Sequence, residues 1–507
     1  MSDAVVAQTE FGRVKGAVCG SVAAFKGIPY AAAPARFMAP GPPEIWTGNR
    51  DAAAYGVRAM QSEGGFAMPQ ALRDLFTPQE PEPIGEACQV LNVWTPGIGD
   101  GRARPAMVWL HGGAFIVGSG GSPWYDGTHL ARRGDVVVVT LNHRLGAFGY
   151  LDLSDVGGET YGASGNAGML DIVAALRWVR ENIAAFGGDP GNVTLFGQSG
   201  GGAKICVLMA MPAAQGLFHK AIIQSGPAVE VMTPANAGET ARKVVAAAGL
   251  RPDDVEALQS LPPERLLAAQ EAVLASIAAL PFAERRRHGF NPVVDGRHLP
   301  RQPFAPTAPA LSATIPMIIG TTADDMNLFF GLAPWAESLD WEGLPDLARG
   351  FLGDRAPELV DAYRRARPGA MPRELMLAIM TDQSIRVPSL VIAERKAAQP
   401  APVYAYRFDW KSPELGGRLG ACHTLEIPFV FDNLASSRLV GDAPGRGALA
   451  AAMSDAWIRF ARTGEPNHDG LPDWPRYTAE NRATMIFDAE CRVEDDPERA
   501  ERLAWAA

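Results

Sequence analysis

The chain has 507 residues, 47% hydrophobic and 20% charged, a balance that fits a globular protein with a large core and not a disordered chain. Its formal net charge of −10 disfavours nucleic acid as a partner, because binding nucleic acid requires a basic surface. The first residues show no basic segment followed by an apolar one, and no apolar run approaches membrane-spanning length. We therefore expect no signal peptide and no contact with a membrane.

The cysteines indicate the redox compartment. There are five, an odd number, and they are scattered along the chain without C-x-x-C or other metal-binding spacing. We expect reduced thiols, no metal site and a cytoplasmic protein. The five are Cys19, Cys88, Cys206, Cys422 and Cys491.

The amino-terminal quarter predicts a small hairpin followed by an irregular region. Residues 11–16 and 23–30 form the hairpin, and residues 31–83, rich in Pro, Gly and Ala, form an ordered surface meander. Two strand-like segments follow, at residues 90–94 and 105–110.

The next region predicts alternating strands and helices. Residues 136–141 are apolar on both faces, which is typical of a central parallel strand. Residues 168–185 carry apolar side chains at helical spacing. A strand at 193–196, a helix at 203–209 and a strand at 221–225 continue the series, so we predict an α/β fold with a mostly parallel sheet and helices on both faces.

The carboxyl-terminal half predicts helical insertions around further strands. Residues 233–300 and 334–400 are the two insertions, and they flank a strand at 316–320. A strand at 403–408, a helix at 446–462 and a polar tail complete the chain. Because no repeat or flexible linker interrupts it, residues 5–495 are predicted to form a single catalytic domain.

A G-x-S-x-G motif at residues 197–201 lies where a predicted strand meets a helix. A turn that sharp leaves no room for a Cβ atom two residues before or after Ser199, and it exposes the serine hydroxyl in front of the helix N-terminus. This pattern predicts a nucleophilic serine. The alternative is a glycine-rich turn with an uninvolved serine.

A second glycine-rich loop, residues 110–115 with the sequence L-H-G-G-A-F, directly follows a strand. Such an H-G-G loop turns backbone N–H groups towards a ligand and completes the oxyanion hole of α/β-hydrolases. We expect His111 to hold the loop rather than take part in catalysis. We expect Phe115 to help form the wall of the substrate pocket.

An activated serine also needs a base and an acid, which follow it along the chain in the order serine, acid, histidine. Of the histidines after Ser199, His423 lies in a loop that follows a strand, so we predict that it is the base. The acid comes from the loop after the strand at 316–320, where Asp324 and Asp325 are adjacent. Spacing alone favours neither.

Together these stretches resemble the type-B carboxylesterase/lipase family, in its bacterial, para-nitrobenzyl esterase-like branch, to which the cholinesterases are related. The likeness runs from about residue 9 to about residue 488. It includes F-K-G-I-P-Y at 25–30, L-N-V-W-T-P at 91–96, L-N-H-R-L-G at 141–146, F-G-G-D-P at 186–190 and D-A-W-I-R-F at 455–460.

The resemblance implies an α/β-hydrolase fold and a serine carboxylic-ester hydrolase that acts through an acyl-enzyme on small to medium esters, with no cofactor and no metal. It assigns Ser199 as the nucleophile, Asp325 as the acid and His423 as the base. The N–H groups of Gly113, Ala114 and Gly200 would bind the oxyanion. These residues are read from the family motifs onto this sequence.

The resemblance also implies structural contacts. Arg36 and Glu86 match positions that pair in the family and tie the amino-terminal loop to the core, and Ser225 matches a serine near the acid. The family's disulfide partner for Cys88 is absent, and the corresponding place is near Ala59.

Three departures from the family pattern concern the site itself. Asp325 replaces the usual Glu, so its loop must approach His423 by roughly 1–1.5 Å more. Met326 replaces a Gly, and Gly200 replaces an Ala, which would add backbone freedom at an oxyanion donor.

Two other functions remain open from the sequence. The same fold serves catalytically silent binding or adhesion proteins, but these typically lack the serine nucleophile that is present here. An amidase or a lipase could use the same triad. We expect a monomer whose partner is a small-molecule ester.

Overall fold

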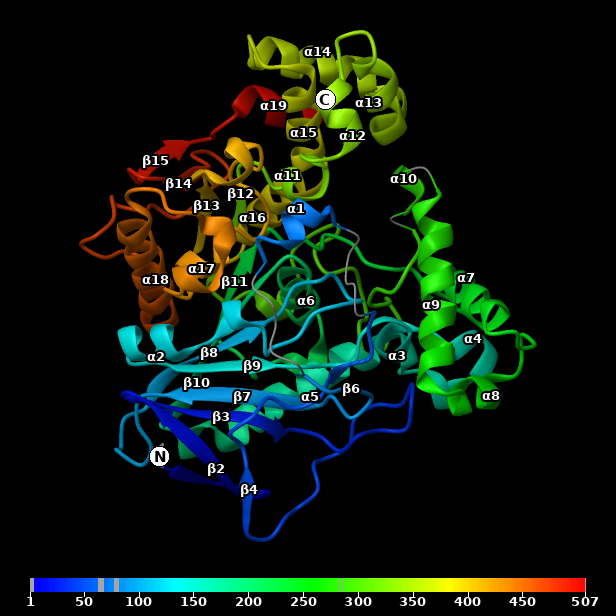
Figure 1. Ribbon diagram of the computed structural model, residues 1–507, viewed down its shortest axis with the longest axis vertical. Coiled ribbons are helices and arrows are strands. Elements are labelled where there is room, and N and C mark those ends of the chain that lie inside the picture. The colour runs from blue at the N-terminus through cyan, green and yellow to red at the C-terminus, as the bar shows by residue number, and fades with distance from the viewer. Residues whose placement is uncertain (1–3, 63–67, 77–81, 281, 286, 507) are drawn as a thin grey trace.

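The fold is built on a 13-stranded sheet (Figure 1). The structure is a computed structural model, and it describes residues 4–62, 68–76, 82–280, 282–285 and 287–506. The strand order is β1-β2-β3-β7-β9-β8-β10-β11-β12-β13-β14-β15, with β4 beside β2. From β9 to β14 every neighbouring pair is parallel, so the predicted mostly parallel sheet is confirmed. The pairs at both ends of the strand order are antiparallel, and β4 pairs parallel with β2 beside it.

The strands at the amino-terminal end of the sheet are β1 (Ala4–Thr9), β2 (Gly12–Cys19), β3 (Val22–Pro29), β4 (Asn49–Asp51) and β7 (Val90–Thr95). The strands of the parallel region are β8 (Arg104–Leu110), β9 (Val137–Leu141), β10 (Gly188–Gln198), β11 (Lys220–Gln224), β12 (Met317–Thr322), β13 (Val403–Phe408) and β14 (Ala483–Phe487), followed by β15 (Arg492–Asp495). The predicted hairpin corresponds to β2 and β3, which pair antiparallel, and β1 extends it.

The predicted meander contains only short elements where the structure describes it. These are β4, β5 (Arg58–Ala59) and α1 (Gln70–Arg73), and β6 (Ile84–Gly85) follows directly after the meander. Residues 63–67 and 77–81 of this region lie outside the described residues.

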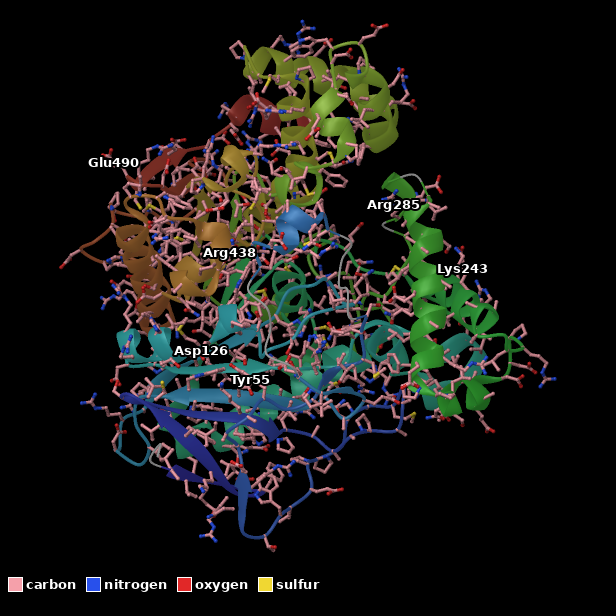
Figure 2. All side chains as sticks on the ribbon, in the orientation of Figure 1. Tyr55, Asp126, Lys243, Arg285, Arg438 and Glu490 are labelled. Atoms are coloured by element: carbon pink, nitrogen blue, oxygen red, sulfur yellow. The ribbon has the colours of Figure 1, made fainter. Side chains whose placement is uncertain are left out.

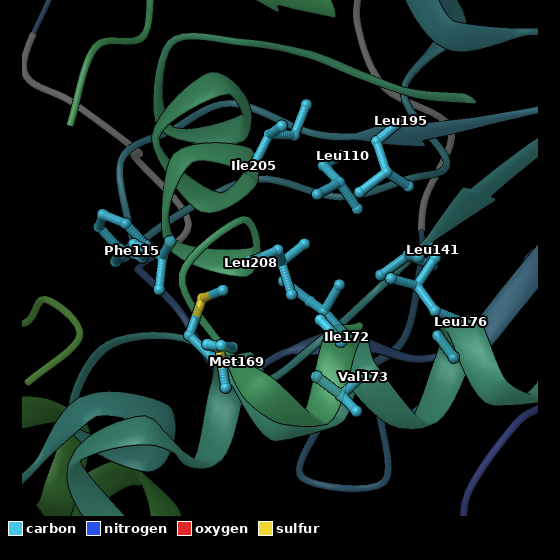
Figure 3. Packing of buried hydrophobic residues seen from close by; sticks show 14 of the residues in the cluster. Leu110, Phe115, Leu141, Met169, Ile172, Val173, Leu176, Leu195, Ile205 and Leu208 are labelled. Carbon is cyan, nitrogen blue, oxygen red and sulfur yellow. The ribbon is translucent and has the colours of Figure 1, made fainter. Parts of the chain in front are cut away.

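Helices cover both faces of the sheet, as predicted. One face is covered by α5 (Ala167–Asn182), α6 (Gly200–Leu208) and α16 (Val387–Ala397), and the other by α2 (Thr128–Gly134), α17 (Ile427–Val430) and α18 (Arg446–Thr463). Successive residues of a buried strand alternate between the two layers, so Leu195 joins the first core and Phe196 the second. Figure 3 shows the first core, where side chains of α5 and α6 meet those of the strands.

The two predicted insertions are helical. The first holds α7 (Pro234–Ala247), α8 (Val255–Ser260), α9 (Pro263–Ala278) and α10 (Phe282–Arg285), and residues 281 and 286 in it lie outside the described residues. The second holds α12 (Pro334–Ser338), α13 (Leu344–Leu352), α14 (Ala356–Ala366), α15 (Pro372–Thr381) and α16. They approach each other where α10 contacts α13 (Figure 1). Between strands and insertions lie α3 (Gly146–Tyr150), α4 (Ser154–Gly157) and α11 (Asn327–Phe330).

Charged side chains lie mainly at the outside of this fold. Arg285 on α10 and Glu490 beyond β14 are examples, and both are exposed (Figure 2). This distribution leaves the two layers beside the sheet to apolar side chains, which is where the large core predicted from composition is found.

The carboxyl-terminal tail differs from the prediction. Residues after α18 are polar in sequence, yet β14 is fully buried and extends the parallel sheet, and β15 and α19 (Arg499–Ala506) follow it. α19 packs against α14, where the Trp505 Nε1 donates to the Tyr363 hydroxyl at 2.8 Å. The prediction failed because the short β14, four apolar residues and Thr484, is preceded by a polar stretch that hides it.

One helical run qualifies as a membrane span by length and composition, contrary to the expectation from the sequence. Within residues Pro372–Ala397, a window of 18 residues has a mean hydropathy of 1.3. Of the tested window, 56% is buried inside the protein, and its last part, α16, packs on β12 and β13. A core helix passes the same test, because burial in protein and burial in lipid select the same side chains.

Candidate active site

The candidate residues lie beyond the carboxyl ends of four neighbouring parallel strands. Ser199 follows β10, Ser225 follows β11, Asp325 lies three residues after β12, and His423 lies in the loop after β13. These strands pair in the order β10-β11-β12-β13, so all four loops leave the same edge of the sheet. Open α/β sheets bind ligands at this edge.

The turn at Ser199 is tight and strained. Ser199 has φ 57° and ψ −126°, a conformation that a non-glycine residue adopts only when its surroundings impose it. Its N–H donates to the Gln224 carbonyl at 2.8 Å. An ideal Cβ on Gly197 or Gly201 would lie 2.8 Å or 2.1 Å from the Leu110 carbonyl oxygen, so the predicted lack of room at both positions is confirmed.

His423 and Asp325 form a buried hydrogen-bonded pair. The His423 Nδ1 lies 2.6 Å from the Asp325 Oδ1, and the two residues are 3% and 0% exposed. Since an ionised carboxylate only accepts, the proton of a neutral imidazole lies on Nδ1. The Nε2 is then left with a lone pair that can take a proton.

Asp325 is held by two further donors. Its Oδ2 accepts from the Ser225 hydroxyl at 3.2 Å and from the Thr322 N–H at 3.1 Å. The contact with Ser225 is the one implied by the family resemblance.

Asp324, the other candidate acid, faces a different loop. Its Oδ2 accepts from the Ala421 N–H at 2.9 Å, and burial raises its pKa above the usual range. The structure therefore brings Asp325 and not Asp324 to the histidine, an alternative that spacing left open.

The loop after β8 lies against Ser199, and its carbonyl groups accept hydrogen bonds from other residues. An ideal Cβ on Gly112 would lie 3.5 Å from the Ser199 Cβ. Throughout the part of the chain that the structure describes, no acceptor is found for the N–H groups of Gly113, Ala114 and Gly200. Three free donors beside a serine are what an oxyanion requires.

His111 holds this loop from inside. Its Nδ1 lies 2.8 Å from the Gly112 carbonyl, and its ring stacks on that of His143 with centroids 4.9 Å apart. Burial lowers the His111 pKa to about 3, so the ring is neutral and Nδ1 donates. This geometry supports the loop-holding role expected for His111.

Two aromatic residues near the site differ in exposure. Phe115, expected in the pocket wall, is only 5% exposed and packs edge-on against Tyr150 at 5.0 Å. In Figure 3 it lies in the cluster that holds Leu208 of α6 and Met169 of α5. Phe329 of α11 is instead 42% exposed, and its ring centroid is 5.2 Å from that of His423.

Sequence reasoning also missed Glu426, three residues after His423. Its side chain is fully buried, and its Oε1 accepts from the Gln224 Nε2 at 3.3 Å. Burial, and secondly the charge of Asp325, raise its pKa to about 7. The only available signal was its place in the apolar sequence that follows the histidine.

A model of the carboxylesterase family matches residues 3–505. The chain belongs to this family. It is 40% identical to the para-nitrobenzyl esterase of Bacillus subtilis, over 98% of this chain and 97% of that one. It is also 37% identical to the phenmedipham hydrolase of Pseudarthrobacter oxydans, over 96% and 95% of the two chains.

A solved carboxylesterase structure has the same fold. The carboxylesterase EST55 of Geobacillus stearothermophilus superposes with a TM-score of 0.86 at 43% identity, over 99% of each chain. These similarities confirm the predicted α/β-hydrolase fold and the predicted function. The protein is a carboxylesterase, a serine hydrolase of carboxylic esters.

Other contacts implied by the family resemblance are present in this carboxylesterase. Arg36 pairs with Glu86 through two hydrogen bonds of 2.8 and 2.6 Å. Cys88 packs beside Ala59 in a small buried cluster, and all five cysteines are unpaired thiols.

Proposed function

We propose that Ser199, His423 and Asp325 are the catalytic triad of this carboxylesterase. The His423 Nε2 takes the proton of the Ser199 hydroxyl while the serine Oγ attacks the ester carbonyl carbon. Asp325 stabilises the imidazolium through Nδ1. The protonated histidine then gives its proton to the leaving alcohol, and water, activated by the same histidine, hydrolyses the acyl-enzyme and regenerates Ser199. The observation that carries this proposal is the 2.6 Å contact between His423 and Asp325 at the sheet edge where Ser199 turns.

The N–H groups of Gly113, Ala114 and Gly200 bind the oxyanion of the tetrahedral intermediate. Their support is that all three lack an acceptor among the described residues and lie in loops that touch at Ser199. Each such donor contributes about 2.7–4 kcal/mol to transition-state stabilisation, usually the largest single contribution to acyl transfer.

We also propose small to medium esters with an apolar group as substrates. Phe329 supports this, because a large aromatic side chain left 42% exposed beside the base offers a surface for such a group. The two curated relatives are a para-nitrobenzyl esterase and a phenmedipham hydrolase, and the nitrobenzyl group in the first name is aromatic. The protein acts as a cytoplasmic monomer, without membrane or nucleic acid; its reduced cysteines and acidic charge support this.

A silent binding homologue and an amidase or lipase are less well supported. The proposed nucleophile, base, acid and oxyanion donors are all present in the chain, which favours an active enzyme over a silent homologue. Among the described residues, Phe329 is the only one of the exposed large apolar side chains that contacts His423, whereas an interfacial lipase exposes a broad apolar lid.

The test is active-site titration with a diethyl phosphate ester together with Ser199→Ala. We expect one equivalent of phosphoryl label on Ser199 and, for the variant, loss of labelling and a fall of about 10⁴–10⁶-fold in kcat on p-nitrophenyl acetate. The control is Ser312→Ala, a buried serine before β12 at the opposite end of the strands. Labelling on another residue, or wild-type turnover by Ser199→Ala, would overturn the assignment.

A screen of p-nitrophenyl esters of graded acyl length tests the substrate class. We expect kcat/KM to rise from acetate to a short or medium acyl chain and then to fall. Phe329→Ala should raise KM for aryl esters more than for methyl esters, since uniform binding is removed. An equal change in KM for aryl and methyl esters would show that Phe329 does not contact the aryl group of the substrate.

A further inference from the structure

A lysine side chain is buried directly behind the candidate oxyanion loop. Lys204 lies on α6, five residues after Ser199, and has 0% exposure. Within the described ranges, no carboxylate lies at ion-pair distance from it. Sequence reasoning treated this helix as apolar and missed it. A buried ammonium group without a counter-ion is costly, so its persistence requires other contacts.

The lysine contacts are two carbonyl groups of the same loop. Its Nζ donates to the His111 carbonyl at 3.1 Å and to the Ala114 carbonyl at 2.8 Å. These carbonyls bracket residues 112–114, which carry two of the three free N–H groups. The Nζ also lies 5.1 Å from the centre of the Phe115 ring, which is within cation–π distance.

The remaining carbonyls of the bracketed segment are bound from within the loop. His111 Nδ1 donates to the Gly112 carbonyl, and the Val117 N–H donates to the Gly113 carbonyl at 3.1 Å. Each carbonyl of residues 111–114 therefore accepts a hydrogen bond from the protein, which holds the loop in place. The N–H groups of Gly113 and Ala114 have no acceptor among the described residues and are available to a ligand. Ala114 has φ 53°, a left-handed conformation that a non-glycine residue keeps only when its neighbours hold it.

Gly200 makes the contact between Ala114 and Lys204 possible. An ideal Cβ on Gly200 would lie 2.2 Å from the Ala114 carbonyl oxygen and 2.6 Å from its Cα. The glycine that replaces the usual Ala therefore allows a close approach, in addition to the backbone freedom expected from sequence. Through it the Ala114 carbonyl reaches α6 and meets the lysine.

We propose that Lys204 is a positioning residue for the oxyanion hole. By tying the carbonyls of His111 and Ala114 to the helix that begins at Ser199, it holds the intervening N–H groups at a fixed distance from the nucleophile. The inference rests on the proposed role of those N–H groups. A lysine amine keeps two N–H bonds when it loses its proton, so both contacts survive deprotonation.

Burial of Lys204 removes water from its ammonium group and disfavours the charged form. It lowers the Lys204 pKa to about 7, and burial and the lysine charge together keep the His111 and His143 rings neutral by lowering their pKa values.

The test is Lys204→Met, which keeps the length of the side chain and removes both hydrogen bonds. We expect kcat for p-nitrophenyl acetate to fall by about 10–100-fold with KM changed by less than about threefold, because displaced oxyanion donors weaken only the transition state. Affinity for an aryl trifluoromethyl ketone should fall by the same factor, because the serine Oγ adds to the ketone carbonyl carbon, gives its proton to the histidine and leaves a tetrahedral hemiketal oxyanion in the same place. Lys204→Gln, which keeps one N–H donor, should give an intermediate loss.

The matched control is Lys396→Met. Lys396 is also fully buried, and its Nζ has no partner among the described residues, but it lies on α16 and touches neither loop. It should keep kcat and the ketone affinity of the wild type. Titration with the diethyl phosphate ester must still give one label per chain in every variant, which separates failure of this inference from failure of the triad.

Three outcomes would overturn the role of Lys204. The first is a kcat of Lys204→Met within twofold of the wild type. The second is an equal loss in Lys396→Met. The third is a rise in KM with unchanged kcat and unchanged ketone affinity. If Lys204→Met does not fold, the same limits apply to Lys204→Gln.

Discussion

The two halves of the active site are held together in different ways. On the serine side, the loops at 111–117 and 199–201 meet through main-chain atoms and glycines, with one lysine behind them. On the histidine side, the loops at 322–326 and 420–426 share two main-chain hydrogen bonds, but the contacts that set the site are those of two carboxylates and the imidazole, with the Ser225 hydroxyl beside them. The geometry of the first half depends mainly on close steric packing, and that of the second half on side-chain charges and hydrogen bonds.

This difference determines how each half can fail. Adding one carbon to the serine side displaces a donor without touching His423, Asp325 or Glu426. Changing one polar atom on the histidine side alters where protons reside without altering the shape. The predictions below test this division, from the largest expected effect to the smallest.

The largest effect is expected at the acid. Asp325→Asn should lower kcat by about 10⁴-fold, because an amide no longer holds Nδ1 protonated and the ring can take the wrong tautomer. Asp324→Asn should cost less than about fivefold, since an amide oxygen can still accept from Ala421. Steady-state kinetics on p-nitrophenyl acetate measure both. The reverse ranking would move the acid to Asp324.

The next effect is expected from one methyl group on the serine side. Gly200→Ala should lower kcat by about 10–100-fold, because the new Cβ would lie 2.2 Å from the Ala114 carbonyl oxygen and must displace that loop. KM and the pH dependence of kcat should stay close to those of the wild type. A changed pH profile would show that the two halves are not separate.

A third effect concerns stability and pH on the histidine side. The Glu426 pKa is raised from 4.5 to about 7, so the folded protein holds this proton more tightly than the unfolded chain. Between pH 4.5 and 7, rising pH ionises the carboxyl in the unfolded chain but not in the folded protein, so the free energy of unfolding falls. Below pH 4.5 the carboxyl is protonated in both states, and its contribution to stability no longer changes with pH.

Glu426→Gln removes this titration. From pH 5 to pH 8 the variant should gain about 1–3 kcal/mol of unfolding free energy relative to the wild type, measured by urea unfolding. A constant difference between the two proteins across this range would contradict the assignment.

The smallest effect is expected at Ser225. Ser225→Ala removes the hydroxyl that donates to Asp325 at 3.2 Å but leaves the Thr322 N–H in place. We expect a loss of about 1 kcal/mol, or roughly fivefold in kcat/KM. A loss as large as that of Asp325→Asn would mean that Ser225, without help from the Thr322 N–H, orients the Asp325 carboxylate.

Much of the fold could be predicted because its signals are local. The strand at 403–408 was predicted with the bounds of β13, and the helix at 446–462 ends one residue short of α18. The G-x-S-x-G turn gave Ser199 its place, because glycines on both sides of a serine are a steric requirement.

What was missed depends on contacts between distant segments. Lysine is ordinarily exposed, and only the packing of α6 against the loop after β8 buries Lys204. The choice between Asp324 and Asp325 required the position of a loop about 100 residues away, as the separation of 98 between Asp325 and His423 indicates. β14 was missed because a polar stretch precedes its short apolar run and because its neighbour in the sheet, β13, is distant in sequence.

The helix α19 has a practical consequence for handling the protein. Glu498, just before it, lies 2.5 Å from Arg367, 3.3 Å from Arg386 and 3.5 Å from Arg407. Removing residues 496–506 would leave three guanidinium groups without this shared carboxylate, at the base of the second insertion. Fusion partners and surface attachment are therefore best placed at the amino-terminal end, where β1 lies at the far edge of the sheet.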